Sequence, residues 1–135
     1  MLDEEKLRKL YEVNPFNQTL GGEILEIKEG YAKGRLEMDA RYENIYGGMH
    51  GGCLFTLADS LCGIAAATYG HYVTTLNGNI NYLRAAKNCR EVICEAQVVR
   101  MGRTIGVIDY TICGDDGTLF ATGTFHYYAL QEELE

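Results

Sequence analysis

The longest apolar segment of this chain reads Gly51-Gly-Cys-Leu-Phe-Thr-Leu-Ala-Asp-Ser-Leu-Cys-Gly-Ile-Ala-Ala-Ala-Thr-Tyr69, and Gly70 follows it. The segment is too long for a strand and is apolar around nearly its whole circumference as a helix. A helix of that kind is buried on most sides by other structure. Asp59 and Ser60 in its middle, without flanking basic residues, argue against a membrane-spanning segment. The sequence therefore predicts a central helix over residues 51–69, wrapped by the rest of the fold.

Segments with strand-like patterns lie on both sides of this helix. Before it, residues 23–28 and 31–38 are separated by Glu29-Gly30, which is typical of a hairpin turn. After it, the apolar pattern changes to period two in four segments divided by short breaks; they cover residues 73–83, 91–100, 104–113 and 119–129.

A short amphipathic helix is expected over residues 3–13, and Asn14-Pro15 is interpreted as its end. The predicted fold class is α+β, with a six-stranded antiparallel sheet wrapped around one long central helix and a short N-terminal helix. The length of 135 residues suits a single domain, 1–135, that buries its own core.

Composition narrows the partners and the compartment. The chain holds 12 Lys+Arg against 19 Asp+Glu, a net charge of −7, which argues against a nucleic-acid partner. Its five cysteines are odd in number and lack Cys-x-x-Cys spacing, and its start is acidic where a signal peptide is basic. Free thiols and a cytoplasmic location are therefore expected. The three histidines lie far apart in sequence, so no metal site is expected.

Asp59 is the residue most suggestive of chemistry. A carboxylate inside an apolar helix costs several kcal/mol of desolvation unless it is paired or hydrated. No Lys or Arg lies within one helical turn of Asp59. Either this face of the helix meets solvent or a second subunit, or Asp59 is a functional carboxylate.

The segment directly before the helix reads Gly47-Gly-Met-His-Gly-Gly52. Glycines at a helix start let the unpaired backbone N–H groups approach a ligand oxygen. An oxyanion hole requires such donors, although a sharp turn into the helix uses the same glycines. Asn44 adds a side-chain amide donor six residues before His50, and His50 can orient a neighbouring group or bind a ligand.

The spacing of these two features constrains how they can cooperate. Asp59 lies eight residues beyond Gly51, which is about 12 Å along a helix axis. A carboxylate acting on a carbonyl held at Gly51 has to lie within roughly 3 Å of the attacking water. One helix cannot place both groups at one carbonyl. If both belong to one site, two copies of the chain must share it, and a homodimer is expected.

Two segments together carry a family resemblance: Asn44-Ile-Tyr-Gly-Gly-Met-His-Gly-Gly-Cys-Leu-Phe-Thr-Leu-Ala-Asp59 and Thr74-Thr-Leu-Asn-Gly-Asn-Ile-Asn-Tyr-Leu-Arg-Ala-Ala86. They resemble the PaaI-type hotdog-fold acyl-CoA thioesterases, and the order of elements agrees over residues 15–130. The resemblance implies a hotdog homodimer with sites at the subunit interface, paired into a tetramer. It also implies hydrolysis of an acyl-CoA thioester with no metal and no cofactor beyond the CoA of the substrate.

The resemblance also implies a role for each matched residue. Asp59 would be the catalytic carboxylate, which deprotonates the water or attacks the carbonyl directly. The Gly51 N–H would polarise the carbonyl, with Asn44 beside it and His50 holding that end of the site. A hydroxyl residue on the strand after the helix assists the carboxylate in this family, and Thr75 matches it best, with Thr74 as the alternative.

Charge along the chain suggests where CoA would bind. Residues 84–103 hold five basic and two acidic residues, a net charge of +3; the other 115 residues hold 7 basic and 17 acidic residues, a net charge of −10. Arg84 and Arg103 are expected to bind phosphates, although charge at strand edges that blocks aggregation explains them equally well. Thr74, Asn77 and Tyr82 are the other expected substrate-binding residues. Aromatic candidates for the acyl pocket are Tyr46, Phe55, Tyr69, Tyr72 and Tyr82.

The function expected from the sequence is hydrolysis of an aryl or a short- or medium-chain acyl-CoA to the free acid and CoA. Two alternatives stay open: a hotdog hydratase or dehydratase acting on acyl thioesters, and a non-catalytic acyl-CoA binding module. Cys53 lies three residues after His50, but it begins the apolar run and is disfavoured as a nucleophile.

Overall fold

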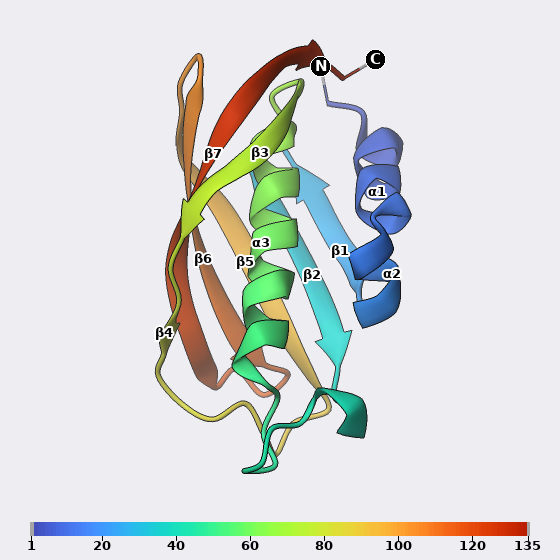
Figure 1. Ribbon diagram of the computed structural model, residues 1–135, viewed down its shortest axis with the longest axis vertical. Helices are drawn as coiled ribbons and strands as arrows, with labels where there is room; N and C mark the ends of the chain where they lie inside the picture. Colours follow the sequence, from blue (N-terminus) through green and yellow to red (C-terminus); the bar gives the residue numbers. More distant parts are fainter. Residues whose placement is uncertain (1, 135) are drawn as a thin grey trace.

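The computed structural model describes residues 2–134, which form an antiparallel sheet curled around a long helix (Figure 1). The helices are α1 (Glu4–Val13), α2 (Pro15–Leu20), the 3-10 helix η1 (Ala40–Tyr42) and α3 (Gly51–Ala67). The strands are β1 (Glu23–Lys28), β2 (Tyr31–Glu37), β3 (His71–Gly78), β4 (Asn81–Tyr82), β5 (Glu91–Met101), β6 (Ile105–Gly114) and β7 (Leu119–Glu133). The predicted α+β fold class is confirmed.

The sheet places β3 beside β7, and this pairing builds part of the candidate site. Strand order is β1-β2-β5-β6-β7-β3, with β4 also paired to β7, and the paired strands are antiparallel. Thr75 of β3 lies directly opposite Tyr127 of β7. Residues opposite each other on neighbouring strands share one face of the sheet. Both side chains point toward α3, because both contact Asp59 of that helix.

Helix α3 is buried because small and apolar side chains let the sheet approach it closely. Leu57, Ala58 and Leu61 have no exposed surface, and burying each leucine contributes roughly 1.5–3 kcal/mol to folding. A Cβ on Gly34 of β2 would lie 2.9 Å from the methyl carbons of Leu61. The sheet and the helix can meet at this point only because Gly34 has no side chain.

The N-terminal segment forms two helices, whereas the sequence predicted one. The side chain of Asn14 accepts a hydrogen bond from the Phe16 N–H at 3.1 Å, and Pro15 occupies the first helical position of α2. Proline is favourable there because that position needs no N–H donor. Asn14-Pro15 thus both ends α1 and begins α2. Figure 1 shows α1 and α2 beside α3, on the side of the sheet that α3 covers.

The strand expected over residues 73–83 is split into β3 and β4, so the sheet within residues 2–134 has seven strands rather than the predicted six. Between them, the backbone oxygen of Asn79 accepts a hydrogen bond from Tyr110 Oη at 2.7 Å. The Asn79 side chain accepts another from the Thr124 N–H at 3.2 Å. A Cβ on Gly123 would collide with the same backbone oxygen. These contacts with β6 and β7 interrupt the regular pairing.

No helix within residues 2–134 has both the length and the apolar composition needed to cross a membrane. The predicted free thiols are confirmed for all five cysteines, of which Cys62 and Cys94 are fully buried.

Candidate active site

Asp59 is held by two hydroxyl groups from the sheet. Thr75 Oγ1 donates a hydrogen bond to Asp59 Oδ1 at 2.8 Å, and Tyr127 Oη lies 2.8 Å from the same oxygen. Tyr127 Oη also lies 2.5 Å from the backbone oxygen of Asp59. Within residues 2–134, Asp59 Oδ2 accepts no hydrogen bond. One carboxylate oxygen is therefore anchored, and the other is free to act on a ligand.

The structure brings Thr75, and not Thr74, to the carboxylate. Thr74 is the neighbouring residue on β3, so its side chain points to the opposite face of the sheet, where it is exposed. Geometry thus favours Thr75 between the two predicted candidates.

Tyr127 was not predicted from the sequence. Burial, followed by the neighbouring Cys62 and Asp59, raises the pKa of Tyr127 well above its ordinary value. Its hydroxyl therefore keeps its proton at neutral pH and acts as a hydrogen-bond donor. The period-two pattern places residue 127 on the buried face with Phe125, but only the paired strand and the helix together reveal what its hydroxyl contacts.

The start of α3 leaves one backbone donor available. His50 caps the helix, since its Nδ1 accepts a hydrogen bond from the Gly52 N–H at 2.9 Å. The Gly51 N–H has no acceptor within residues 2–134. Tyr82 Oη donates to the Gly51 backbone oxygen at 2.9 Å, and a Cβ on Gly51 would lie 2.7 Å from Tyr82 Oη. Glycine at position 51 thus makes room for the tyrosine ring.

Asn44 shapes the loop before α3. Its Oδ1 accepts hydrogen bonds from the backbone N–H groups of Tyr46 at 2.8 Å and Gly48 at 3.2 Å. Asn44 lines the same cavity as Gly51, and its amide NH₂ donates no hydrogen bond within residues 2–134.

The predicted catalytic residues fall into two separate cavities. A cavity of about 260 Å³, here called the Asp59 cavity, is lined by Leu10, Tyr11, Asn14, Asn17, Asp59, Ser60, Gly63, Ile64, Ala67, Tyr72, Val73, Thr75 and Tyr127. A cavity of about 620 Å³, the helix-start cavity, is lined by Asn44, Tyr46, Gly48, Met49, His50, Gly51, Gly52, Leu54, Tyr82, Leu83, Arg84, Ala85 and Ala86. The two share no residue, so one protomer does not bring Asp59 to Gly51.

The expected CoA-binding residues are also dispersed. Arg84 lines the helix-start cavity, and its N–H donates to the Phe120 oxygen at the beginning of β7. Arg103 lies in the β5–β6 turn, next to Thr104, whose backbone oxygen accepts from the Ala129 N–H near the other end of β7. Nine residues of strand separate these two points, about 30 Å. Within one protomer the two arginines therefore cannot bind the same phosphate.

The remaining predicted residues have defined neighbours. Asn77 Oδ1 lies 2.8 Å from His126 Nδ1. Of the aromatic candidates, Tyr46 and Tyr82 line the helix-start cavity, and Tyr72 lines the Asp59 cavity. Phe55 instead packs on Phe125, with ring centroids 5.0 Å apart.

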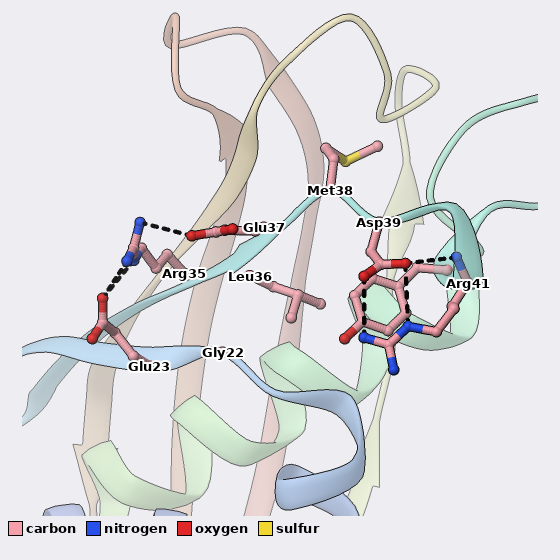
Figure 2. Close-up of a pocket in the computed structure, with 9 residues that line it drawn as sticks. Gly22, Glu23, Arg35, Leu36, Glu37, Met38, Asp39 and Arg41 are labelled. Carbon is pink, nitrogen blue, oxygen red and sulfur yellow. Dashed lines mark hydrogen bonds and ion pairs between the residues drawn. The ribbon is translucent and has the colours of Figure 1, made fainter.

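A further pocket, drawn in Figure 2, lies between β1, β2 and η1. Its charged side chains are paired locally: Arg35 contacts Glu23 at 2.6 Å, and Arg41 contacts Asp39 at 3.1 Å. No predicted site residue lines it, so it is separate from the candidate site.

Neither a metal centre nor a reactive thiol is indicated in the part of the chain described. Residues 2–134 contain no group of three or more His, Cys, Asp or Glu side chains that could hold a metal ion. Burial raises the pKa of the Cys53 thiol, which lowers its thiolate fraction at neutral pH.

Comparisons with known proteins identify the family and the fold. The model of the thioesterase superfamily matches residues 46–121, which include the start of α3, Asp59 and Thr75. The acyl-coenzyme A thioesterase PaaI of Escherichia coli is 30% identical over 103 residues, 76% of this chain and 74% of that protein. The solved structure of E. coli PaaI matches with a TM-score of 0.91 at 24% identity, over 97% of this chain and 95% of the other, which confirms the hotdog fold. A Streptococcus mutans protein solved with bound acetyl-CoA matches with a TM-score of 0.78 at 28% identity, over 82% and 89% of the two chains.

Proposed function

The chain belongs to the thioesterase superfamily and is a thioester hydrolase, and we propose that it hydrolyses an acyl-CoA at sites shared by two copies of the chain. The observation that carries this proposal is the state of Asp59, whose Oδ1 is held by Thr75 and Tyr127 while Oδ2 is free at a cavity wall. A carboxylate fixed in that way is prepared to act on water or on a carbonyl carbon.

At the other end of the site, the proposal assigns the Gly51 N–H to the thioester carbonyl. Its N–H is unpaired, and it lies at the positive end of the α3 dipole, so it stabilises the negative charge that develops on the carbonyl oxygen. The Asn44 amide is the second donor at that oxygen. His50 keeps the helix start in place through its bond to the Gly52 N–H.

Asp59 Oδ2 then removes a proton from the attacking water or attacks the carbonyl itself. On the first route the water oxygen bonds to the carbonyl carbon as the C–S bond breaks, which gives the free acid and the CoA thiolate directly. On the second route an anhydride forms between Asp59 and the acyl group as the thiolate leaves, and one water then hydrolyses that anhydride to the free acid. A thiolate is a fair leaving group, so little acid assistance is needed. Thr75 and Tyr127 are positioning residues, because they contact the carboxylate and not the substrate.

The proposed dimer follows from distance. Gly51 and Asp59 are separated by about 12 Å along α3, and they line different cavities. Two copies with antiparallel α3 helices bring the Gly51 of one protomer to the Asp59 of its partner. Each dimer then holds two sites related by two-fold symmetry.

The Asp59 cavity is the place proposed for the acyl group, because the carboxylate forms part of its wall. Leu10, Ile64 and Val73 contribute apolar surface to its wall, and none of its lining residues is Lys, Arg or His. An anionic acyl group would lose its hydration beside Asp59 without gaining a cation. The substrates expected are therefore uncharged acyl groups.

The helix-start cavity is correspondingly the place proposed for the thiol-side portion of CoA. It is the larger of the two, and Arg84 lies at its wall, where a guanidinium can bind a phosphate. Arg103 lies too far away in the same protomer, so any contact it makes with CoA comes from the other copy.

A panel of acyl-CoA esters, followed by release of free thiol, tests the proposal. The wild-type protein should cleave uncharged acyl-CoAs, and Asp59→Asn, which preserves side-chain volume, should lower kcat/KM by about 10²–10⁴-fold. Thermal melting of the variant controls for folding. Turnover that survives Asp59→Asn at the wild-type rate would sink the assigned mechanism. Tight acyl-CoA binding without thiol release would indicate a binding module instead.

A further inference from the structure

Gly63 occupies a particular place in the wall of the Asp59 cavity. It lies four residues after Asp59 on α3, so it is on the same helix face, one turn further along. Ala67 follows one turn later and also lines the cavity. Along this face of α3, the cavity wall beyond Asp59 therefore carries no side chain larger than a methyl group, while Ile64 lines the cavity from the adjacent position.

The fold itself does not require glycine at position 63. A Cβ built there would lie 3.5 Å from Tyr127 Cε1 and 3.7 Å from its Oη, which is ordinary van der Waals contact. Its backbone is not in the left-handed region that favours glycine. By contrast, a Cβ on Gly51 would lie 2.7 Å from Tyr82 Oη, and one on Gly34 would lie 2.9 Å from Leu61. Close packing therefore requires glycine at positions 51 and 34, whereas it does not require glycine at position 63.

Glycine inside a helix destabilises it relative to alanine, because glycine loses more backbone freedom on folding. Position 63 carries that cost in the interior of α3 without relieving any clash. What the missing methyl group does provide is space, directly beyond the carboxylate and at the surface of the cavity.

We propose that Gly63 sets the upper size of the acyl group that this enzyme accepts. The inference rests on the proposed binding of the acyl group in the Asp59 cavity. An apolar cavity of about 150 Å³ holds a benzene molecule, so the volume of about 260 Å³ has room for a ring or a chain that extends past Asp59. An acyl group of that size has to pass over Gly63 to reach Ala67, whereas a short acyl group ends before it.

The test compares acyl-CoA substrates of different acyl length in two variants, one in which the Asp59 cavity is narrowed and one in which it is widened. Gly63→Ala adds a single methyl group at the α3 face of the cavity, and Ile64→Val removes one methylene from the neighbouring wall. The quantity measured is the ratio of kcat/KM for octanoyl-CoA or phenylacetyl-CoA to kcat/KM for butanoyl-CoA. One methylene in an apolar pocket changes discrimination by about 10–200-fold. Gly63→Ala should lower the ratio at least about tenfold, and Ile64→Val should raise it.

A matched control adds one methylene away from the cavity. Val99 of β5 is 61% exposed and lines neither cavity, so Val99→Ile should leave both the ratio and the turnover at wild-type values. Thermal melting accompanies each variant, and Gly63→Ala should melt at or above the wild-type temperature, because alanine favours the helix.

Each outcome bears on a different claim. An unchanged ratio in Gly63→Ala and Ile64→Val, with wild-type turnover of butanoyl-CoA, overturns the role of Gly63 and leaves the proposed function standing. A clear fall in the melting temperature of Gly63→Ala also overturns it, because glycine would then be needed for packing. If the wild-type protein cleaves no acyl-CoA at all, the proposed function fails first and this inference fails with it.

Discussion

Complementation between two inactive variants is the sharpest test of a site shared by two protomers. One variant is Asp59→Asn, which removes the carboxylate. The other is Gly51→Pro combined with Tyr82→Ala, which removes the backbone N–H at the start of α3. Proline suits the first position of a helix, and the conformation of His50 before it, with φ −58° and ψ 135°, is one that a residue before proline prefers. Tyr82 is shortened because its hydroxyl would lie 2.7 Å from a Cβ at position 51.

The expected magnitude follows from the geometry of α3. Losing one oxyanion donor lowers kcat by about 10²–10³-fold, so each variant alone retains at most about one per cent of wild-type turnover. Gly51 and Asp59 lie about 12 Å apart on one helix. If each site instead combines Gly51 of one protomer with Asp59 of its partner, every mixed dimer has one intact site and one doubly altered site. Random pairing makes about half of the dimers mixed, and half of their sites are intact, so roughly a quarter of wild-type turnover should return in the whole mixture and roughly half in purified mixed dimers.

The assay co-expresses the two variants with different affinity tags and purifies the mixed species through both. Gly51→Ala combined with Tyr82→Ala is the matched control, because it adds the same Cβ and keeps the N–H; it should be clearly more active than the proline variant. The reasoning is refuted if a purified mixed dimer shows no more activity than the sum of its parents. Each site would then be built within a single protomer.

Two further variants test the ends of the site. Tyr127→Phe should lower kcat about tenfold with little change in KM and cost about 1–3 kcal/mol of stability, because Asp59 Oδ1 then keeps only its bond from Thr75. Steady-state kinetics measures the change in kcat, and thermal melting measures the change in stability. An unchanged kcat would leave Tyr127 with a purely structural role. Arg84→Ala should raise KM for a CoA ester several-fold more than for an N-acetylcysteamine thioester of the same acid, since only the former carries phosphates. Arg103→Ala provides the comparison, and equal effects on both substrates would argue against phosphate binding.

The parts of the fold that depend on local patterns could be predicted from the sequence. The period-two segments and the glycine-containing turns locate the strands to within a few residues, and the apolar run over 51–69 becomes α3 at Gly51–Ala67. The split after Gly78 could not be predicted, because it depends on Tyr110, which reaches Asn79 from a strand that comes about thirty residues later. Asn14-Pro15 did carry the signal of a new helix, since asparagine is a capping residue and proline favours the first helical position.

The candidate site divides in the same way. Asp59 and the glycines before α3 stand out because their residue types are unusual for their local setting. Tyr127 does not stand out, because a tyrosine on the inward face of a strand is an ordinary core residue until its hydroxyl is seen to contact the carboxylate. His50 was expected to hold its end of the site, and its Nδ1 caps α3. The large distance between Arg84 and Arg103 results from the strand order, and a count of charges along the chain gives no information about strand order.

The rigid stretch of α3 between Gly51 and Asp59 also bears on which changes in chain length the protein can tolerate. Each residue of an α-helix turns the chain by about 100° and advances it by about 1.5 Å. Inserting or deleting one residue between Gly51 and Asp59 would therefore rotate the carboxylate away from Thr75 and Tyr127, even though every side chain of the site were still present. The largely exposed β6–β7 turn, residues 115–118, contributes no residue to either cavity and lies under no such constraint. Natural or engineered variation in length should accordingly collect in that turn and be absent from the first half of α3.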